Sequence, residues 1–150
     1  MYNYLSVRPK PHEFVPLIDL MRGLLSSILI NTETPWSVAY DQIVVRNDTS
    51  LREFSDLVSK PASTSAIIEA LNLIYDAYDI VVYSPSPADK AQHYSIFMEK
   101  EAIPHVESYL SIIDSGELIV YFSDRSLMML AFEYLAVNEK ISLKESSVYS

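Results

Sequence analysis

Two aspartates occupy positions where a carboxylate could carry out chemistry. Asp48 and Asp124 each follow an apolar predicted strand and precede a predicted helix. Ligands of open α/β sheets bind beyond the carboxyl ends of the strands, so two parallel neighbouring strands would bring these carboxylates together around a magnesium ion. An aspartate just before a helix is also a favoured N-cap. We expect capping, and a small metal-dependent phosphoesterase built on this pair remains an alternative.

Other catalytic patterns are weak or missing in the sequence. The three histidines, at positions 12, 93 and 105, lack the pair spacing of a zinc site, and there is no cysteine to act as ligand, nucleophile or disulfide partner. The two glycines stand at positions 23 and 116, whereas phosphate-binding loops need several close together. The sequence therefore predicts no catalytic residue, no metal and no cofactor, and favours a role that is not enzymatic.

Negative charge is concentrated in two windows. The chain has 20 acidic and 11 basic residues and a formal net charge of −9, with four carboxylates in residues 61–89, five in residues 101–124, and no lysine or arginine in either window. Four of these acids lie on predicted helices over 63–78 and 104–115, opposite the apolar stripe, and they are Glu69, Asp76, Glu107 and Asp114. If both helices cover the same side of a sheet, they form one acidic face, whose members are Glu69, Asn72, Asp76, Asp79, Glu107, Asp114 and Glu117.

Such a face favours a basic protein as partner, because opposite charge accelerates encounter, and the same charge disfavours nucleic acid and anionic membranes. The most concrete hypothesis is an acidic protein-binding module of the immunity or inhibitor type, which neutralises a basic toxin or nuclease by covering its active surface. A secretion-type chaperone that dimerises and binds through an apolar groove is a second hypothesis. An ordinary solvated surface, acidic for solubility alone, would show the same charge.

The hydrophobic pattern predicts one α/β domain over residues 1–150, in which a mixed sheet of four to five strands is covered by helices on at least one face. The expected order is α-β-α-α-β-β-α-β-α. Helices are expected over 12–31, 50–60, 63–78, 104–115 and 124–135, and strands over 36–46, 79–84, 92–99 and 117–122. A short edge strand is expected near Ile141 and Leu143, with an extended lead-in over 1–11 and a frayed end over 145–150.

Several local signals refine this scheme. Ser50 and Glu53 have the spacing of a capping box, and the apolar alternation shifts near Asp41 and Gln42, which indicates a bulge or bend. The tyrosines on predicted helix stripes are expected to pack in the core, and these are Tyr75, Tyr78, Tyr109 and Tyr134. The most apolar stretch, 14–30, contains charged residues and is short for a membrane span. With no secretory signal apparent in the first residues, we expect a cytoplasmic protein.

Overall fold

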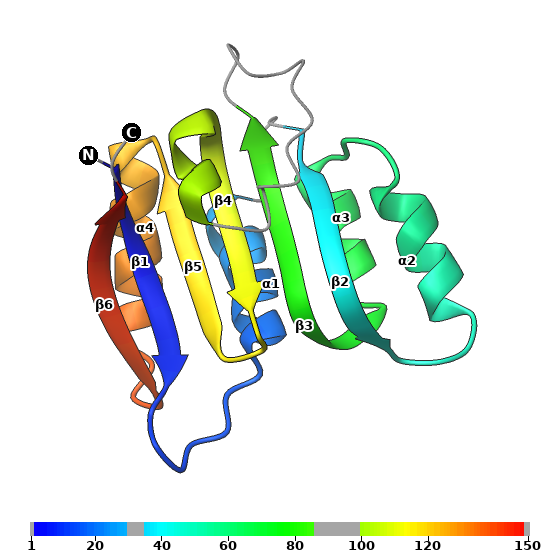
Figure 1. The fold of residues 1–150 in the computed structure, drawn as a ribbon, viewed down its shortest axis with the longest axis horizontal. Coiled ribbons are helices and arrows are strands. Elements are labelled where there is room, and N and C mark those ends of the chain that lie inside the picture. Colours follow the sequence, from blue (N-terminus) through cyan, green and yellow to red (C-terminus); the bar gives the residue numbers. More distant parts are fainter. Residues whose placement is uncertain (1, 30–34, 86–99, 149–150) are drawn as a thin grey trace.

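Six strands form one antiparallel sheet in the order β2-β3-β4-β5-β1-β6 (Figure 1). The computed structural model describes residues 2–29, 35–85 and 100–148. The strands are β1 (Tyr2–Pro9), β2 (Ser37–Val45), β3 (Ile74–Pro85), β4 (Val106–Ile113), β5 (Glu117–Phe122) and β6 (Ile141–Val148). The predicted combination of helices with one sheet is confirmed, whereas the predicted mixed sheet of four to five strands is wrong in strand number and in strand direction.

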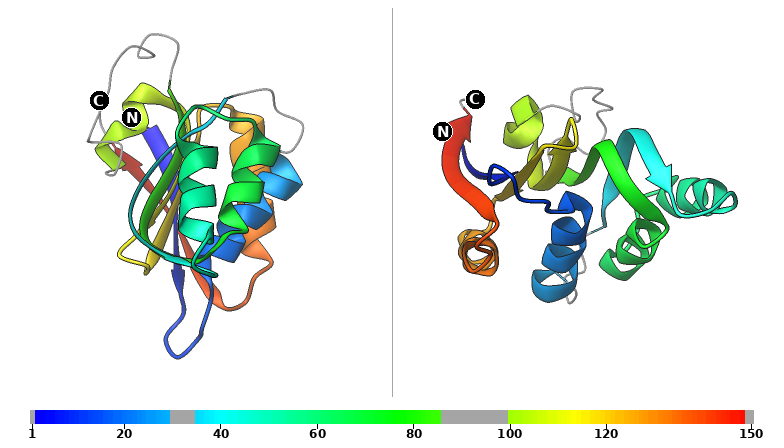
Figure 2. Two further views of the ribbon diagram at one scale, coloured as in Figure 1. Left: turned by 90° about the vertical axis from the view of Figure 1, so that its right-hand side faces the viewer. Right: turned by 90° about the horizontal axis from the view of Figure 1, so that it is seen from below.

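Among the described elements, four α-helices cover one side of this sheet, and a short 3-10 helix lies on the other side (Figure 2). The α-helices are α1 (Leu17–Ile28), α2 (Ser50–Val58), α3 (Thr64–Leu71) and α4 (Arg125–Ala136), and the 3-10 helix is η3 (Lys100–His105). We call the two sides the helix face and the η3 face. Apolar side chains of all four α-helices pack on the helix face in one core, which confirms that helices cover at least one face. None of the described helices is long and apolar enough to cross a bilayer.

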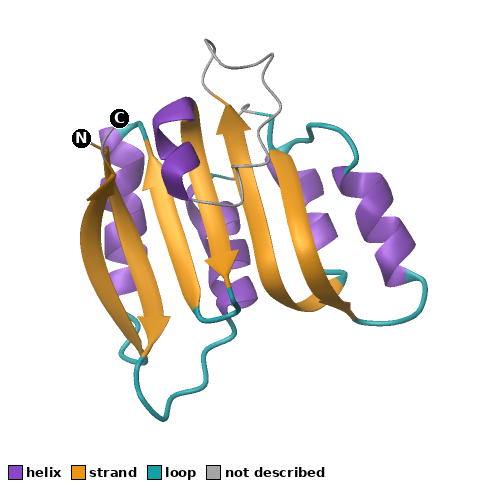
Figure 3. Cartoon of the chain, in the orientation of Figure 1, coloured by secondary structure: helices purple, strands orange, loops and turns teal. Residues whose placement is uncertain are grey.

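The helix expected over 104–115 is wrong, because residues 106–113 form the central strand β4 (Figure 3). Leu110 and Ile112 point into the core on the helix face, while Tyr109 belongs to the cluster under η3. Both faces of the strand are buried, so its sequence is apolar on both sides and lacks the simple alternation of a half-buried strand. The glycine expected to end a helix lies instead in the three-residue hairpin turn between β4 and β5, where Asp114 and Ser115 have φ values of 51° and 50°.

The helix expected over 63–78 is half right. It begins as predicted, since the Ser63 hydroxyl accepts from the Ala66 amide at 3.3 Å, but α3 ends at Leu71 and residues from Ile74 belong to β3. The aromatic and β-branched residues after Leu71 favour a strand once a partner strand is available. Tyr75 and Tyr78 consequently lie at the surface, 66% and 46% exposed, and the expectation that they pack in the core is wrong.

Both ends of the described chain take part in the sheet. The expected lead-in over 1–11 is in fact β1, an interior strand between β5 and β6. The edge strand expected near Ile141 and Leu143 is confirmed, and it continues to Val148, so the residues expected to fray up to that point are paired with β1. The strand expected over 92–99 lies outside the described residues.

The helix starts also differ in detail from the expected ones. The first helix begins at Leu17 after Pro16 instead of at residue 12. The capping box at Ser50 is wrong, because Ser50 is the first residue of α2 and is buried, and no side chain caps the helix. The turn before α2 is stabilised by Asn47, whose Oδ1 accepts from the amide and the hydroxyl of Thr49 at 3.1 and 2.8 Å.

Tyrosines from adjacent strands form a row on the η3 face. Tyr83, Tyr109 and Tyr121 lie side by side in the register of β3, β4 and β5, and Tyr4 of β1 is buried in the same cluster. Burial raises the pKa of Tyr83 and of Tyr121. Ala102 and Ile103 of η3 belong to this cluster, and the Lys100 Nζ lies 5.7 Å from the centre of the Tyr4 ring. The 3-10 helix is therefore held on the sheet by apolar packing and a cation–π contact.

Gly23 in α1 is required for close packing against α4. A Cβ added at this position would overlap the Tyr134 hydroxyl. Alanine normally stabilises a helix by about 1 kcal/mol relative to glycine, but here we expect Gly23→Ala to lower the free energy of unfolding. In a Tyr134→Phe background the loss should be smaller by about 0.5 kcal/mol or more, because the overlapping oxygen is gone. Urea unfolding of the four proteins of this cycle measures the coupling, and additive effects would contradict the packing argument.

Candidate functional site

Three of the seven predicted site residues come together at one end of the sheet. Asp76 and Asp79 lie near the start of β3, and Asp114 lies in the turn that joins β4 to β5. Asp41, in the middle of β2, is directly opposite Asp79 in the strand register. We call these four residues, Asp41, Asp76, Asp79 and Asp114, the acidic end.

Strand pairing and one hydrogen bond join residues of the acidic end, since Asp41 lies opposite Asp79 and Asp79 binds the Asp114 backbone. The Asp79 Oδ1 accepts from the Asp114 amide at 3.0 Å, which joins the β4–β5 turn to β3. Asp76 lies opposite Val44, and its Oδ1 accepts from the Ala77 amide at 2.8 Å. Within the described ranges the ion pairs are Arg8–Glu117 and Arg22–Asp19, so none of these four carboxylates is in one. Like charges on directly opposed strand positions repel.

Exposed aromatic and apolar side chains border the acidic end. Tyr78 is close enough to Asp114 that the negative charge of that carboxylate raises the pKa of the phenol, with smaller contributions from lost solvent, a hydrogen bond to Asp114 and the charge of Asp79. Val44, opposite Asp76, is also exposed. A tyrosine beside carboxylates offers a large contact area and a hydrogen-bonding group at low cost in side-chain entropy, as is usual in protein interfaces.

The other four predicted site residues lie elsewhere. Glu117 is only 12% exposed, and its carboxylate accepts from the Ser6 hydroxyl and pairs with Arg8 at 3.3 Å, so it is used within the fold. Glu107 lies at the other end of β4, where its Oε2 accepts from the Ser123 hydroxyl at 2.5 Å. The predicted grouping of all seven residues required a helix over 104–115, and that helix is a strand.

Glu69 and Asn72 belong to the helix layer, at α3 and its C-terminal end. Asn72 has basic neighbours, since its carbonyl oxygen accepts from the Arg46 Nε at 2.8 Å and its side-chain oxygen accepts from Arg22 at 3.4 Å. The surface around Asn72 is therefore not uniformly negative.

Sequence reasoning did not include Asp41 and Tyr78 in the site. The signal for Asp41 was present in the shift of alternation after it, and the structure places a positive φ of 56° at Gln42. The signal for Tyr78 was hidden because its spacing from Tyr75 also fits a helix. Only the pairing of β2 with β3 shows that these residues border the same surface.

Asp48 and Asp124 do not converge. Asp48 follows β2 and Asp124 follows β5; these strands are separated by β3 and β4, and three successive antiparallel pairings make them run in opposite directions. The two aspartates therefore lie at opposite ends of the sheet along the strand direction, with two strands between them. The Asp124 Oδ1 accepts from the amides of Ser126 and Leu127 at 2.8 and 3.1 Å, which confirms the predicted N-cap of α4. Among the described residues, no group of three or more histidine or acidic side chains could hold a metal ion.

The N-cap at Asp124 predicts that replacing Asp124 lowers the stability of the fold more than replacing Asp48 does. Asp124→Ala should lower the free energy of unfolding by about 1 kcal/mol, because two amides of the first turn of α4 lose their acceptor. Asp48→Ala is the matched control, since Asp48 is exposed and does not cap α2, and we expect a change within about 0.5 kcal/mol. Denaturant unfolding measures both, and equal effects would show that Asp124 does not act as a cap.

The negative charge of Asp114 predicts that the phenol of Tyr78 loses its proton at a higher pH than an ordinary tyrosine. In Asp114→Asn the pKa of Tyr78 should fall toward the ordinary value of 10.0, because the main cause of the shift is removed, while asparagine tolerates the positive φ of the turn. Since the folded chain holds this proton more tightly than the unfolded chain, the free energy of unfolding should decrease as pH rises above 10.0, and by less in the variant. The ¹³Cζ resonance of Tyr78, identified by its loss in Tyr78→Phe, reports the titration. An unchanged titration in Asp114→Asn would contradict the contact.

Comparison with known proteins adds no identification. No known protein family, no curated protein and no solved structure matches this chain. The acidic end is therefore interpreted from its own geometry and charge.

Proposed function

We propose that this chain is a protein-binding module that takes a basic partner on the acidic end. The observation that supports this most directly is the gathering of Asp41, Asp76, Asp79 and Asp114 beside the exposed Tyr78, with no lysine or arginine of the described residues in an ion pair with them. The concrete version is an inhibitor of the immunity type, which would cover the substrate-binding surface of a cationic toxin or nuclease.

The physical basis of the proposal is electrostatic steering. With a net charge of −9, the chain attracts cations from a distance, and a cluster of like charges at one end of the sheet concentrates the negative potential there. A basic partner would also relieve the repulsion between Asp41 and Asp79, which face each other across β2 and β3. Because such attraction is screened within about 10 Å at 0.1 M salt, binding should weaken as salt rises.

The alternative of a metal-dependent phosphoesterase loses its basis, because it required Asp48 and Asp124 to meet and they lie at opposite ends of the sheet, two strands apart. The alternative of a chaperone-like protein with an apolar groove requires a different surface from the acidic end.

A double charge reversal tests the proposed function. Asp41→Lys with Asp76→Lys should reduce the affinity for a basic protein partner at least tenfold, which corresponds to about 1.4 kcal/mol. Both side chains are exposed, and a lysine at position 41 would face Asp79, so the fold should be retained. The variant is compared with wild type in pull-downs at low and high salt, followed by titration of the identified partner.

Glu69→Lys with Glu139→Lys is the matched control, because it changes the net charge equally at exposed positions away from the acidic end. We expect the control to bind nearly as well as wild type. Equal weakening in both variants would show that only total charge matters, and full binding by the acidic-end variant would refute the assignment of this surface.

A further inference from the structure

The outer edge of the last strand, β6, is unpaired within the part of the chain that the structure describes. Among the described strands β6 pairs with β1 alone, and the register between them runs without a break from Tyr2–Val148 to Pro9–Ile141 (Figure 1). A long, regular edge of this kind presents a row of free backbone donors and acceptors, which is a template for another strand.

The register shows which residues present those groups. The Lys10 amide donates to the Lys140 carbonyl at 2.9 Å, and the same register continues along β6, so the even-numbered residues of β6 exchange hydrogen bonds with β1. Hydrogen-bonded and non-bonded positions alternate in an antiparallel pair. The amides and carbonyls of the odd-numbered residues therefore point outward, and these residues are Ile141, Leu143, Glu145 and Ser147.

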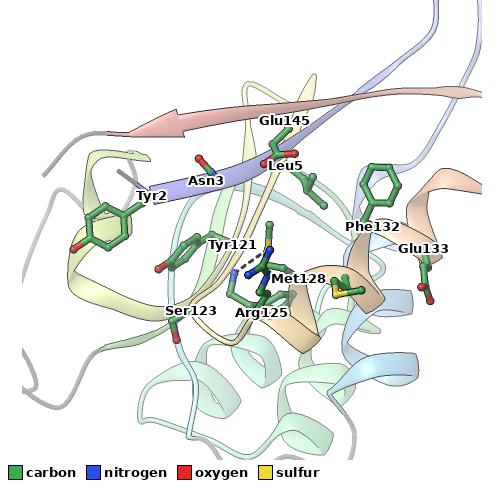
Figure 4. Close-up of a pocket in the computed structure, with 12 residues that line it drawn as sticks. Tyr2, Asn3, Leu5, Tyr121, Ser123, Arg125, Met128, Phe132, Glu133 and Glu145 are labelled. Carbon is green, nitrogen blue, oxygen red and sulfur yellow. Dashed lines mark hydrogen bonds between the residues drawn. The ribbon is translucent and has the colours of Figure 1, made fainter.

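A groove of about 760 Å³ lies beside this edge on the helix face, lined by α4 and by residues of β1 and β5, with Glu145 contributed by β6 (Figure 4). Its apolar wall includes Leu5, Met129 and Phe132, of which Met129 and Phe132 are 59% and 49% exposed. The odd-numbered side chains of β6 belong to this face, since Leu143 packs against the core of the helix face and Glu145 lines the groove. A strand added to β6 would place alternate side chains on the same side as α4.

The charges of the groove indicate the chemistry of its occupant. Glu133 and Glu145 line it together with one cation, Arg125, on a chain with a net charge of −9. The apolar wall and the two carboxylates match a segment whose alternate side chains are apolar and basic.

A second copy of this chain fits the edge less well. In a symmetric antiparallel pair of two β6 strands, the odd-numbered, outward-facing residues of one copy must lie opposite odd-numbered residues of the other. The symmetry axis then passes through a single residue of β6. The two registers of greatest overlap place Lys144 opposite Lys144 or Glu145 opposite Glu145. Like charges at directly opposed positions are destabilising. The shared net charge of −9 adds to this repulsion.

We propose that an extended segment of a partner protein, with alternating apolar and basic side chains on one face, adds to β6 as a seventh strand and fills the groove beside α4. This surface is separate from the acidic end, which is formed by β2, β3 and the β4–β5 turn, so the inference does not depend on the proposed function.

The test uses a fluorescent nine-residue peptide, Thr-Val-Thr-Lys-Thr-Val-Thr-Lys-Thr, whose valines and lysines share one face. We expect saturable binding by anisotropy below about 1 mM. Phe132→Ser should weaken binding at least tenfold, whereas Leu130→Ser, at a residue 47% exposed on α4 that does not line the groove, should leave it unchanged. Glu145→Pro removes an outward amide without removing a hydrogen bond to β1, and it should also weaken binding at least tenfold.

Three results would overturn the inference. The first is no saturable binding at about 1 mM peptide. The second is equal binding by wild type and Phe132→Ser. The third is a wild-type dimer in sedimentation that Glu145→Pro dissociates, because the edge would then be occupied by a second copy. The double variant Asp41→Lys with Asp76→Lys should bind the peptide like wild type, so failure at the acidic end and failure at β6 are distinguishable.

Discussion

The central strand β4 constrains most of this molecule, because it is hydrogen-bonded along both edges and packed on both faces. Its helix-face residues enter the core with α1, α2, α3 and α4, while Tyr109 is covered on the η3 face. Because β3 and β5 flank the strand, its last residue must be followed by an immediate reversal of the chain. That reversal uses positive φ at Asp114 and Ser115, and it brings Asp114 to the Asp79 carboxylate. The acidic end thus follows from how the central strand ends.

This gathering of charge has a cost within the folded chain. Like charges directly opposed across strands lower stability by roughly 0.2–1 kcal/mol, and Asp41 and Asp79 stand in that relation. By contrast, Glu117 is paired with Arg8 and accepts a hydrogen bond from the Ser6 hydroxyl. Glu117 is therefore used within the fold, whereas the repulsion between Asp41 and Asp79 would have to be relieved by a positively charged group from outside the fold.

The two edge strands of the sheet differ in how well they are protected against pairing with another chain. The edge strand β2 has a positive φ at Gln42 and a register shift between Val44 and Val45, and irregularities of this kind discourage pairing with another chain. The opposite edge, β6, pairs with β1 over eight residues without a shift and contains no proline. Within β6 the charged residues are Lys144 and Glu145, and these charges oppose self-pairing more than they oppose a basic strand.

The sequence by itself determined the elements whose signals are local. The helix start at Ser63, the cap at Asp124, the strand over 117–122 and the excess of negative charge all depend on residues near one another in the chain. Only the tertiary structure decided that residues 2–9 and 106–113 are strands, because a strand buried on both faces has no amphipathic period, and its stability comes from partners far away in the sequence. For the candidate site, too, part was predictable from the local sequence and part was decided by the tertiary structure. Asp76, Asp79 and Asp114 could be identified as acids without cationic neighbours in the sequence, but their meeting with Asp41, and the separation of Glu69 and Glu107 from them, were decided by strand order and register.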